Sequence, residues 1–180
     1  FQGVPEENPG AVEFFQKRGY QAAWSSVNMR LDLAGYDPGQ VDIPPVPEGI
    51  AFRLLETGEE PALLAAVEDA QPAWLEFYQG CPSPILVAVE QGQLVGFAMV
   101  PPEGGRFLGD VEKPGSLECV GVVKSHRNRG IGMGMVLAGI RWLKEQGCGS
   151  IELRYVALED WYHKVGFCTF QRMWMGEKNL

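Results

Sequence analysis

The stretch from Leu117 to Met135 constrains the fold of this chain most, because it reads as an apolar strand, a basic glycine-containing loop and the start of a helix. The first backbone N–H groups of a helix have no hydrogen-bond partner within the helix, and they carry the positive end of the helix dipole. Gly130, Gly132 and Gly134 let the backbone approach a ligand there. Basic side chains that can add charge are Lys124, His126, Arg127 and Arg129. The stretch therefore predicts a phosphate site.

The rest of the chain alternates between predicted strands and helices. Patterning and turn residues predict a helix over 8–17, a strand over 20–33, a Pro/Gly-rich linker over 35–49, a strand over 50–55, a helix from a Thr57–Glu60 capping box to about residue 69, a helix over 73–79, strands over 84–89, 94–100 and 116–123, a helix that ends at Gly147, a strand over 150–156, a helix over 159–164 and a strand over 167–177. This order predicts an α/β fold with a mixed sheet and helices on both faces.

The composition of the chain limits the kinds of partner and site that we expect. With 180 residues, of which 46% are hydrophobic, the chain is long enough for one domain with a substantial core. Its net charge of -8 argues against a nucleic-acid partner, which requires a basic face. Its 4 cysteines lack C-x-x-C spacing and it has 2 histidines, so we expect no metal site and reduced cysteines in the cytoplasm. No apolar run reaches the roughly 20 residues that a membrane span needs, so we expect no membrane partner.

Two motifs together resemble the GNAT superfamily of N-acetyltransferases. The first is Arg127-x-x-Gly130-x-Gly132 after a valine-rich strand, and the second is the segment WYHKVGF at 161–167. Either motif alone is weak evidence, whereas both in the family's order, about one helix and one strand apart, are specific. The resemblance implies the GNAT fold. It also implies transfer of an acetyl group from acetyl-coenzyme A to a primary amine of a small molecule or peptide.

The resemblance assigns residues to the cofactor. Backbone amides between Arg129 and Gly134 are expected to bind its pyrophosphate, and Val122 and Val123 to pair with its pantetheine amides as a neighbouring strand would. In the family a bulge opens this strand, and Gly121 could relieve strain there. The expected cofactor-binding residues are Val122, Val123, Arg127, Arg129, Gly130, Ile131, Gly132, Met133 and Gly134.

Attack of an amine on a thioester needs a proton acceptor, stabilisation of the carbonyl oxygen and a proton donor for the leaving thiolate. We assign the acceptor to Glu118, a charged residue in an apolar strand, and the stabilisation to the Val122 N–H. The family motif places Tyr162 beside the sulfur as the donor, since a phenol with a pKa of about 10 stays protonated. Structural roles for Glu118 and Tyr162 are the alternatives. Other candidates for the base are Asp110, Glu159 and Asp160.

Three aromatic residues of the second predicted helix, Trp74, Phe77 and Tyr78, are candidates for the wall of an acceptor pocket. Aromatic residues at helical spacing are more often part of a core, so both interpretations stay open. The activity also has an alternative, a GNAT-like domain that binds an acyl-coenzyme A without turnover as a sensor or structural partner. The intact loop and Tyr162 favour the enzyme.

The N-terminal segment resembles the second motif. Residues 13–20 align without gaps on residues 160–167, and the two segments lie 147 residues apart, from Gly19 to Gly166. The first copy has Phe15 where the second has Tyr162, and no Arg-x-x-Gly-x-Gly loop precedes it. We therefore expect residues 4–34 to be the remnant of a preceding GNAT-like domain, 35–49 a linker and 50–180 the acetyltransferase domain. The remnant should dock on the main domain's sheet edge or on a second copy in a homodimer.

Overall fold

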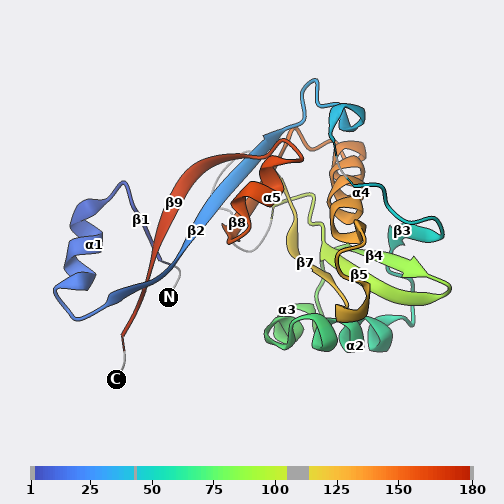
Figure 1. The fold of residues 1–180 in the computed structure, drawn as a ribbon, viewed down its shortest axis with the longest axis horizontal. Helices are drawn as coiled ribbons and strands as arrows, with labels where there is room; N and C mark the ends of the chain where they lie inside the picture. Colours follow the sequence, from blue (N-terminus) through green and yellow to red (C-terminus); the bar gives the residue numbers. More distant parts are fainter. Residues whose placement is uncertain (1–2, 43, 105–113, 179–180) are drawn as a thin grey trace.

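The computed structural model describes residues 3–42, 44–104 and 114–178, which form two β-sheets with helices packed around them (Figure 1). One sheet has the strand order β3-β4-β5-β7 and the other β1-β9-β2-β8-β6. The strands are β1 (Val4–Pro5), β2 (Gln21–Asp32), β3 (Ile50–Leu54), β4 (Ile85–Glu90), β5 (Gln93–Met99), β6 (Gly115–Ser116), β7 (Glu118–Val122), β8 (Ser150–Val156) and β9 (Cys168–Glu177). The helices are α1 (Pro9–Gln16), α2 (Glu60–Ala70), α3 (Leu75–Tyr78), α4 (Ile131–Glu145) and α5 (Glu159–His163). The predicted α/β fold is confirmed.

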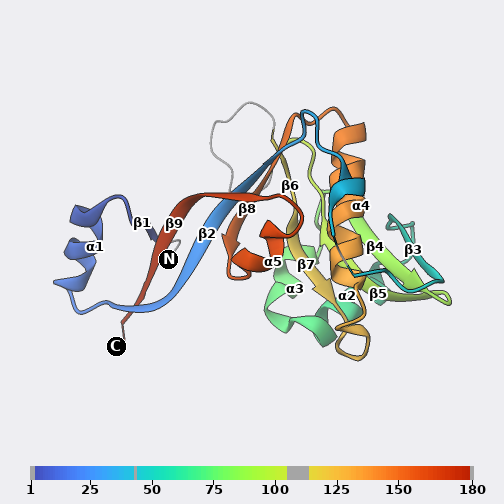
Figure 2. The same cartoon turned by 45° about the horizontal axis from the view of Figure 1, so that its top comes forward.

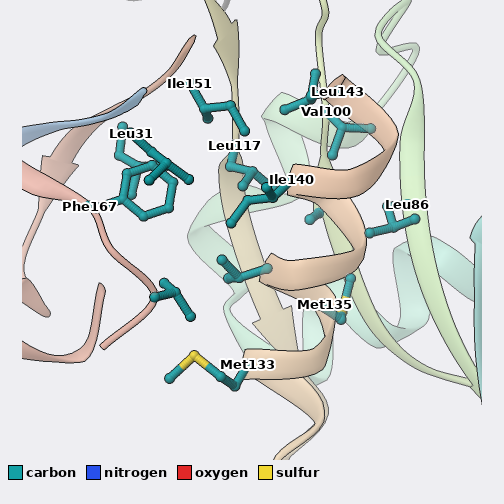
Figure 3. Packing of buried hydrophobic residues seen from close by; sticks show 14 of the residues in the cluster. Leu31, Leu86, Val100, Leu117, Met133, Met135, Ile140, Leu143, Ile151 and Phe167 are labelled. Atoms are coloured by element: carbon teal, nitrogen blue, oxygen red, sulfur yellow. The ribbon is translucent and has the colours of Figure 1, made fainter. Parts of the chain in front are cut away.

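The helix α4 carries the main core and joins the two sheets (Figure 3). Its buried side chains recur at helical spacing, from Ile131 to Ile140 and Leu143, and give it a continuous apolar face. Leu86 of β4 and Ile151 of β8 belong to the same buried cluster, although they come from different sheets. Each such side chain contributes about 1.5–3 kcal/mol when it is removed from water, so this cluster holds the sheets together.

A second core lies between the four-stranded sheet and the helices α2 and α3. Leu63 of α2 and Tyr78 of α3 pack in one cluster with Phe97 of β5, and the rings of Tyr78 and Phe97 meet edge to face at 5.2 Å. The sheet is therefore covered by α4 on one face and by α2 and α3 on the other.

The start of α2 differs from the capping box predicted between Thr57 and Glu60. Its N-cap is Glu59, which makes no side-chain cap bond. The Glu59 carboxylate instead accepts the Glu56 N–H at 2.8 Å and binds Arg53 at 2.7 Å. The ion pair with the preceding strand thus fixes the start of the helix.

The N-terminal strand β2 lies inside the five-stranded sheet, between β8 and β9, and this corrects the expectation that it docks on an edge. Its Met29 and Leu31 are 0% and 4% exposed and belong to the main core. Away from this core, β2 and β9 continue as a long ribbon that has β1 and α1 near its far end (Figures 1 and 2). The strand therefore joins β8 to β9 instead of extending the sheet.

The repeat in the sequence is also a repeat in the structure. The rings of Phe15 and Tyr20 meet edge to face at 5.4 Å and 82°, and those of Tyr162 and Phe167 at 5.8 Å and 82°. The Tyr20 N–H donates to the Phe15 carbonyl at 3.2 Å, and the Phe167 N–H to the Tyr162 carbonyl at 3.3 Å. The two helix-to-strand junctions therefore have the same local geometry.

The pairing of β2 with β9 obeys the same 147-residue offset. Ser25 pairs with Trp174 and Val27 with Arg172. Residues 25 and 27 of β2 correspond to residues 172 and 174 of β9 at this offset. Exchange of the two strands therefore turns the first pair into the second. Ser26 pairs with Met173, its own counterpart, at the centre. The ribbon thus has a local two-fold axis between Ser26 and Met173.

Removal of residues 1–34 is expected to yield an insoluble or unfolded chain. The deletion takes away the strand that joins β8 to β9, and with it buried apolar side chains of the main core. Size-exclusion chromatography and a circular dichroism melt measure the outcome. Removal of residues 1–19 is the matched control, because α1 is exposed or half-buried along its length and the core keeps β2. A folded 35–180 fragment with the parent's melting temperature would contradict this role of β2.

Candidate functional site

A first cavity lies where β7 ends and α4 begins, and its volume is about 480 Å³. Gly130 caps α4 with a φ of 78°, a left-handed conformation that favours glycine. The first intrahelical bond runs from the Gly134 N–H to the Gly130 carbonyl at 3.0 Å. Ile131, Gly132 and Met133, whose amides precede that bond, all line the cavity. The cavity therefore offers an anion a row of backbone donors at the positive end of α4.

Gly134 has a packing role, which differs from its predicted role in cofactor binding. Its N–H belongs to the helix, and a Cβ on it would lie 2.6 Å from both the Phe52 ring and Val46. Residues 44–46, in the predicted linker, also pack against the loop, since a Cβ on Gly130 would lie 2.9 Å from the Pro45 carbonyl oxygen. The extended segment before β3 therefore covers the start of α4.

The two arginines of the loop have different surroundings. Arg127 lines the first cavity, where its side chain donates to the Val122 carbonyl at 3.1 Å and to the Ala70 carbonyl at 2.9 Å. Arg129 instead makes two hydrogen bonds to Glu90, at 2.9 and 2.7 Å, and lies outside the lining of the cavity. The Arg129 guanidinium, with a smaller effect from His126, holds the pKa of Glu90 below its ordinary value. This ion pair corrects the prediction that the Arg129 side chain adds charge to the cavity.

The strand β7 has the predicted bulge, but the residue that bends is Cys119. It has a φ of 49° and lies between the pairs Met99–Glu118 and Phe97–Gly121. Gly121 is needed for another reason, because a Cβ there would lie 2.3 Å from an atom of the Phe97 ring. The bulge turns the following residues of β7 toward the cavities.

The backbone N–H groups of Val122 and Val123 point in opposite directions. The Val123 N–H donates to Val95 of β5 at 3.0 Å, so this N–H is paired within the sheet. In an antiparallel ladder the neighbouring residue points its N–H away from that partner strand, and Val122 lines the first cavity. Val122 alone of the pair therefore has the orientation that the prediction needs.

A second cavity of about 360 Å³ continues from the first and is bounded by β7, β8 and the helices that cover the sheet. Val120, Leu158 and Tyr162 line both cavities, so the two meet at these residues. Trp74 and Phe77 line the second cavity. Of the three aromatic candidates, Tyr78 is instead in the core, where its hydroxyl donates to the Cys119 carbonyl at 2.8 Å and supports the bulge.

The structure brings the two predicted catalytic side chains to the second cavity. Tyr162 is held by edge-to-face contacts with Trp161 at 4.7 Å and Phe167 at 5.8 Å. Burial, with a smaller effect from Cys119, raises the pKa of Tyr162 above its ordinary value of 10.0, so the hydroxyl keeps its proton. Glu118 lines the same cavity and accepts a hydrogen bond from the Ser116 hydroxyl at 3.2 Å.

The other candidates for a base have different positions. Glu159 binds Arg172 at 2.7 Å and accepts the Thr169 hydroxyl at 2.6 Å, and these contacts lower its pKa. Glu159 and Asp160 lie outside the lining of both cavities. Asp110 lies outside the described residues. Among these carboxylates in the described part of the chain, Glu118 is therefore the one that lines the second cavity.

The sequence did not predict that Arg154 and Tyr155 of β8 line the second cavity. Arg154 binds the carboxylate of Glu152, which is 0% exposed and also binds Arg30 of β2. The available signal was the pair of charged residues, Glu152 and Arg154, within a strand that is otherwise largely apolar. The sequence does not show that Glu152 is buried and also binds Arg30, because Arg30 is more than a hundred residues away along the chain.

The described residues contain no group of three or more histidine, cysteine, aspartate or glutamate side chains that could hold a metal ion. Among the helices of the described part of the chain, none is long and apolar enough to cross a membrane.

Comparison with known proteins gives one matching family and several relatives. The sequence model of the acetyltransferase (GNAT) family matches residues 49–167. A mycothiol acetyltransferase from Actinosynnema mirum is 28% identical over 158 residues, and the match covers 79% of this chain and 51% of that protein. The chain thus spans about half the length of this relative.

Solved structures with the same fold include two that bear on the arrangement. A GCN5-related glucosamine N-acetyltransferase region of a fungal multi-domain GH3 β-N-acetylglucosaminidase has a TM-score of 0.81 and 25% identity, covering 98% of this chain and 24% of that one. A tandem GNAT protein from the clavulanic acid biosynthesis pathway has a TM-score of 0.64 and 18% identity, covering 96% of this chain and 60% of that one.

Replacement Gly132→Glu is expected to weaken the binding of coenzyme A by about 100-fold or more, because like charges about 4 Å apart repel by several kcal/mol near a protein surface. A Cβ on Gly132 would have ordinary contacts, 3.5 Å to Trp161 and 3.6 Å to Val122, so the added side chain should be tolerated by the fold. Calorimetry measures the affinity. Gly149→Glu, which adds the same charge at an open position beyond the other end of α4, is the control. Unchanged affinity in a folded Gly132→Glu protein would exclude an anion site at this loop.

Proposed function

The chain belongs to the acetyltransferase (GNAT) family, and on that premise we propose that it is an N-acetyltransferase that moves an acetyl group from acetyl-coenzyme A to a primary amine of a small molecule or peptide. The observation that carries the proposal is the junction of the two cavities. One cavity has the anion-binding start of α4, the other has Glu118, and Tyr162 stands between them. A donor thioester and an acceptor amine can therefore meet at one point.

The residues present fit the cofactor. Acetyl-coenzyme A supplies an activated thioester and an anionic pyrophosphate. The amides of Ile131, Gly132 and Met133 would bind the pyrophosphate, with Arg127 beside them. Val122, which points its N–H away from β5, would hold the pantetheine arm or stabilise charge on the carbonyl oxygen.

Two side chains would move the protons. Glu118 would take a proton from the acceptor amine, directly or through water, since an amine must be neutral to attack. Tyr162 would donate its hydroxyl proton, or a hydrogen bond, to the departing thiolate. Its raised pKa supports this role because the hydroxyl stays protonated across the working range of pH.

An amino sugar is the first acceptor to test. The support is the glucosamine N-acetyltransferase region, which covers 98% of this chain at a TM-score of 0.81. A panel of glucosamine, simple alkylamines and short peptides, followed by thiol release from acetyl-coenzyme A, measures the choice. Binding of coenzyme A with no thiol release across the panel would instead support a domain that binds acyl-coenzyme A without turnover.

We also propose that residues 4–34 are the closing helix and strand of a second GNAT-like unit, joined by residues 35–49 to the acetyltransferase domain at 50–180. The supports are the matching Phe15–Tyr20 and Tyr162–Phe167 junctions and the two-fold pairing of β2 with β9. The first copy has Phe15 in place of the catalytic tyrosine. The four cysteines are in the reduced form, which suits a reducing compartment such as the cytoplasm.

Replacement Tyr162→Phe is expected to lower kcat by about 10²–10⁴, the usual effect of losing a general acid, while the affinity for coenzyme A stays within about three-fold. The ring contacts with Trp161 and Phe167 persist, so the fold should be unaffected. In the parent enzyme, the rate should not decline near pH 10.0, the ordinary pKa of tyrosine, because burial moves the ionisation of Tyr162 upward. An unimpaired Tyr162→Phe enzyme would reduce Tyr162 to a packing residue.

A further inference from the structure

The strand β2 lies outside the residues that match the family, 49–167, yet one of its side chains reaches the wall of the second cavity. Asn28 is 3% exposed and makes two hydrogen bonds. Its Oδ1 accepts the backbone N–H of Tyr155 at 3.3 Å, and its Nδ2 donates to the Gln171 side chain at 2.7 Å. Asn28 thus connects β8 on one side to β9 on the other.

The contact with Tyr155 falls on a bulge in β8. Val27 pairs with Val156 and Met29 with Leu153, so Asn28 alone faces the two residues Arg154 and Tyr155. Tyr155 has a φ of 56°, a conformation that costs a non-glycine residue free energy and needs support from its surroundings. A bulge also leaves a backbone N–H outside the ladder, and the Asn28 side chain accepts that N–H.

Both residues of this bulge line the second cavity. The neighbouring residue of β2 on this side, Arg30, supports the same wall through Glu152, whose buried carboxylate binds Arg30 and Arg154 together. Two residues of β2 therefore support the wall of the second cavity. Asn28 binds the Tyr155 backbone, and Arg30 supports the Arg154 side chain through Glu152.

We propose that Asn28 is a positioning residue for the acceptor amine. By holding the β8 bulge, it fixes the places of Tyr155 and Arg154 and so determines which acceptors fit the cavity. The inference rests on the proposed function only in assigning the second cavity to the acceptor. The N-terminal unit has Phe15 at the position that corresponds to Tyr162. Through Asn28, this unit would nevertheless help to shape the acceptor site of the acetyltransferase domain.

Replacement Asn28→Leu tests the inference, because leucine has a similar size but cannot accept the Tyr155 N–H. We expect the KM for the acceptor to rise about tenfold, the effect of losing one buried hydrogen bond, while the Kd for coenzyme A stays within about two-fold. Asn28→Asp keeps an acceptor oxygen, and the Gln171 amide can turn to donate to it, so its KM should remain within about three-fold of the parent. Equal changes in acceptor KM and coenzyme A Kd would show a general loss of structure and overturn the proposal.

Ser26→Ala is the matched control. Ser26 lies on the same strand two residues away, is 1% exposed, and its hydroxyl has no hydrogen-bond partner within the described part of the chain. We expect both constants to be unchanged. If Asn28→Leu fails to fold, Gln171→Leu removes the other anchor of the Asn28 amide from a half-buried position, and should raise the acceptor KM in the same direction.

Hydrogen exchange at the Tyr155 amide separates this inference from the proposed function. We expect faster exchange in Asn28→Leu than in the parent or Asn28→Asp, whether or not any amine is acetylated. If no amine yields thiol release in the parent, the proposed function fails, and the exchange rates still decide whether Asn28 holds the bulge. Equal exchange in all three proteins would overturn the inference.

Discussion

The divergence of β7 and β8 is the constraint on which the rest of the structure depends. Among the described residues, β6, which directly precedes β7, pairs with β8, whereas β7 and β8 lie in different sheets. Backbone groups left by such a separation must find partners elsewhere. Each strand uses a left-handed residue at this point, Cys119 in β7 and Tyr155 in β8, and each bulge is held by a side chain from a different element, Tyr78 and Asn28. The gap is thereby kept open as two connected cavities.

The parts of this architecture that depend on local sequence could be predicted from it. The apolar stripe of α4, the glycine at its cap and the two motifs lie within short stretches, so spacing alone indicates their structure. Tyr162 could be placed near a cavity because it belongs to such a stretch, and Glu118 because a charge inside an apolar strand needs a reason, and both line the second cavity. The repeat was also visible, since its two copies of eight residues align without gaps.

The parts that depend on contacts distant in sequence could not be predicted. The ion pair of Arg129 with Glu90 joins the loop to the end of β4, and removes from the cavity a charge that the motif suggests should be there. The position of β2 inside the sheet follows from pairing with strands more than a hundred residues later, which its own alternation does not specify. Asn28 was missed for the same reason, because its contact with Tyr155 arises only from that pairing, as does the contact of Arg30 with Glu152.

The loop's basic sequence and its structure differ in a way that bears on how a chain with a net charge of -8 would bind the proposed anion. Glu90 binds both Arg129 and His126, and Arg127 is engaged with two backbone carbonyls. The first cavity therefore combines the helix dipole and the amides at the start of α4 with the side chains of Arg127 and Lys164, which also line it. Fixed backbone donors need no side-chain rearrangement to meet a ligand. An anion site built in this way keeps its geometry when surface charges are screened, which a site built from mobile cations would not do.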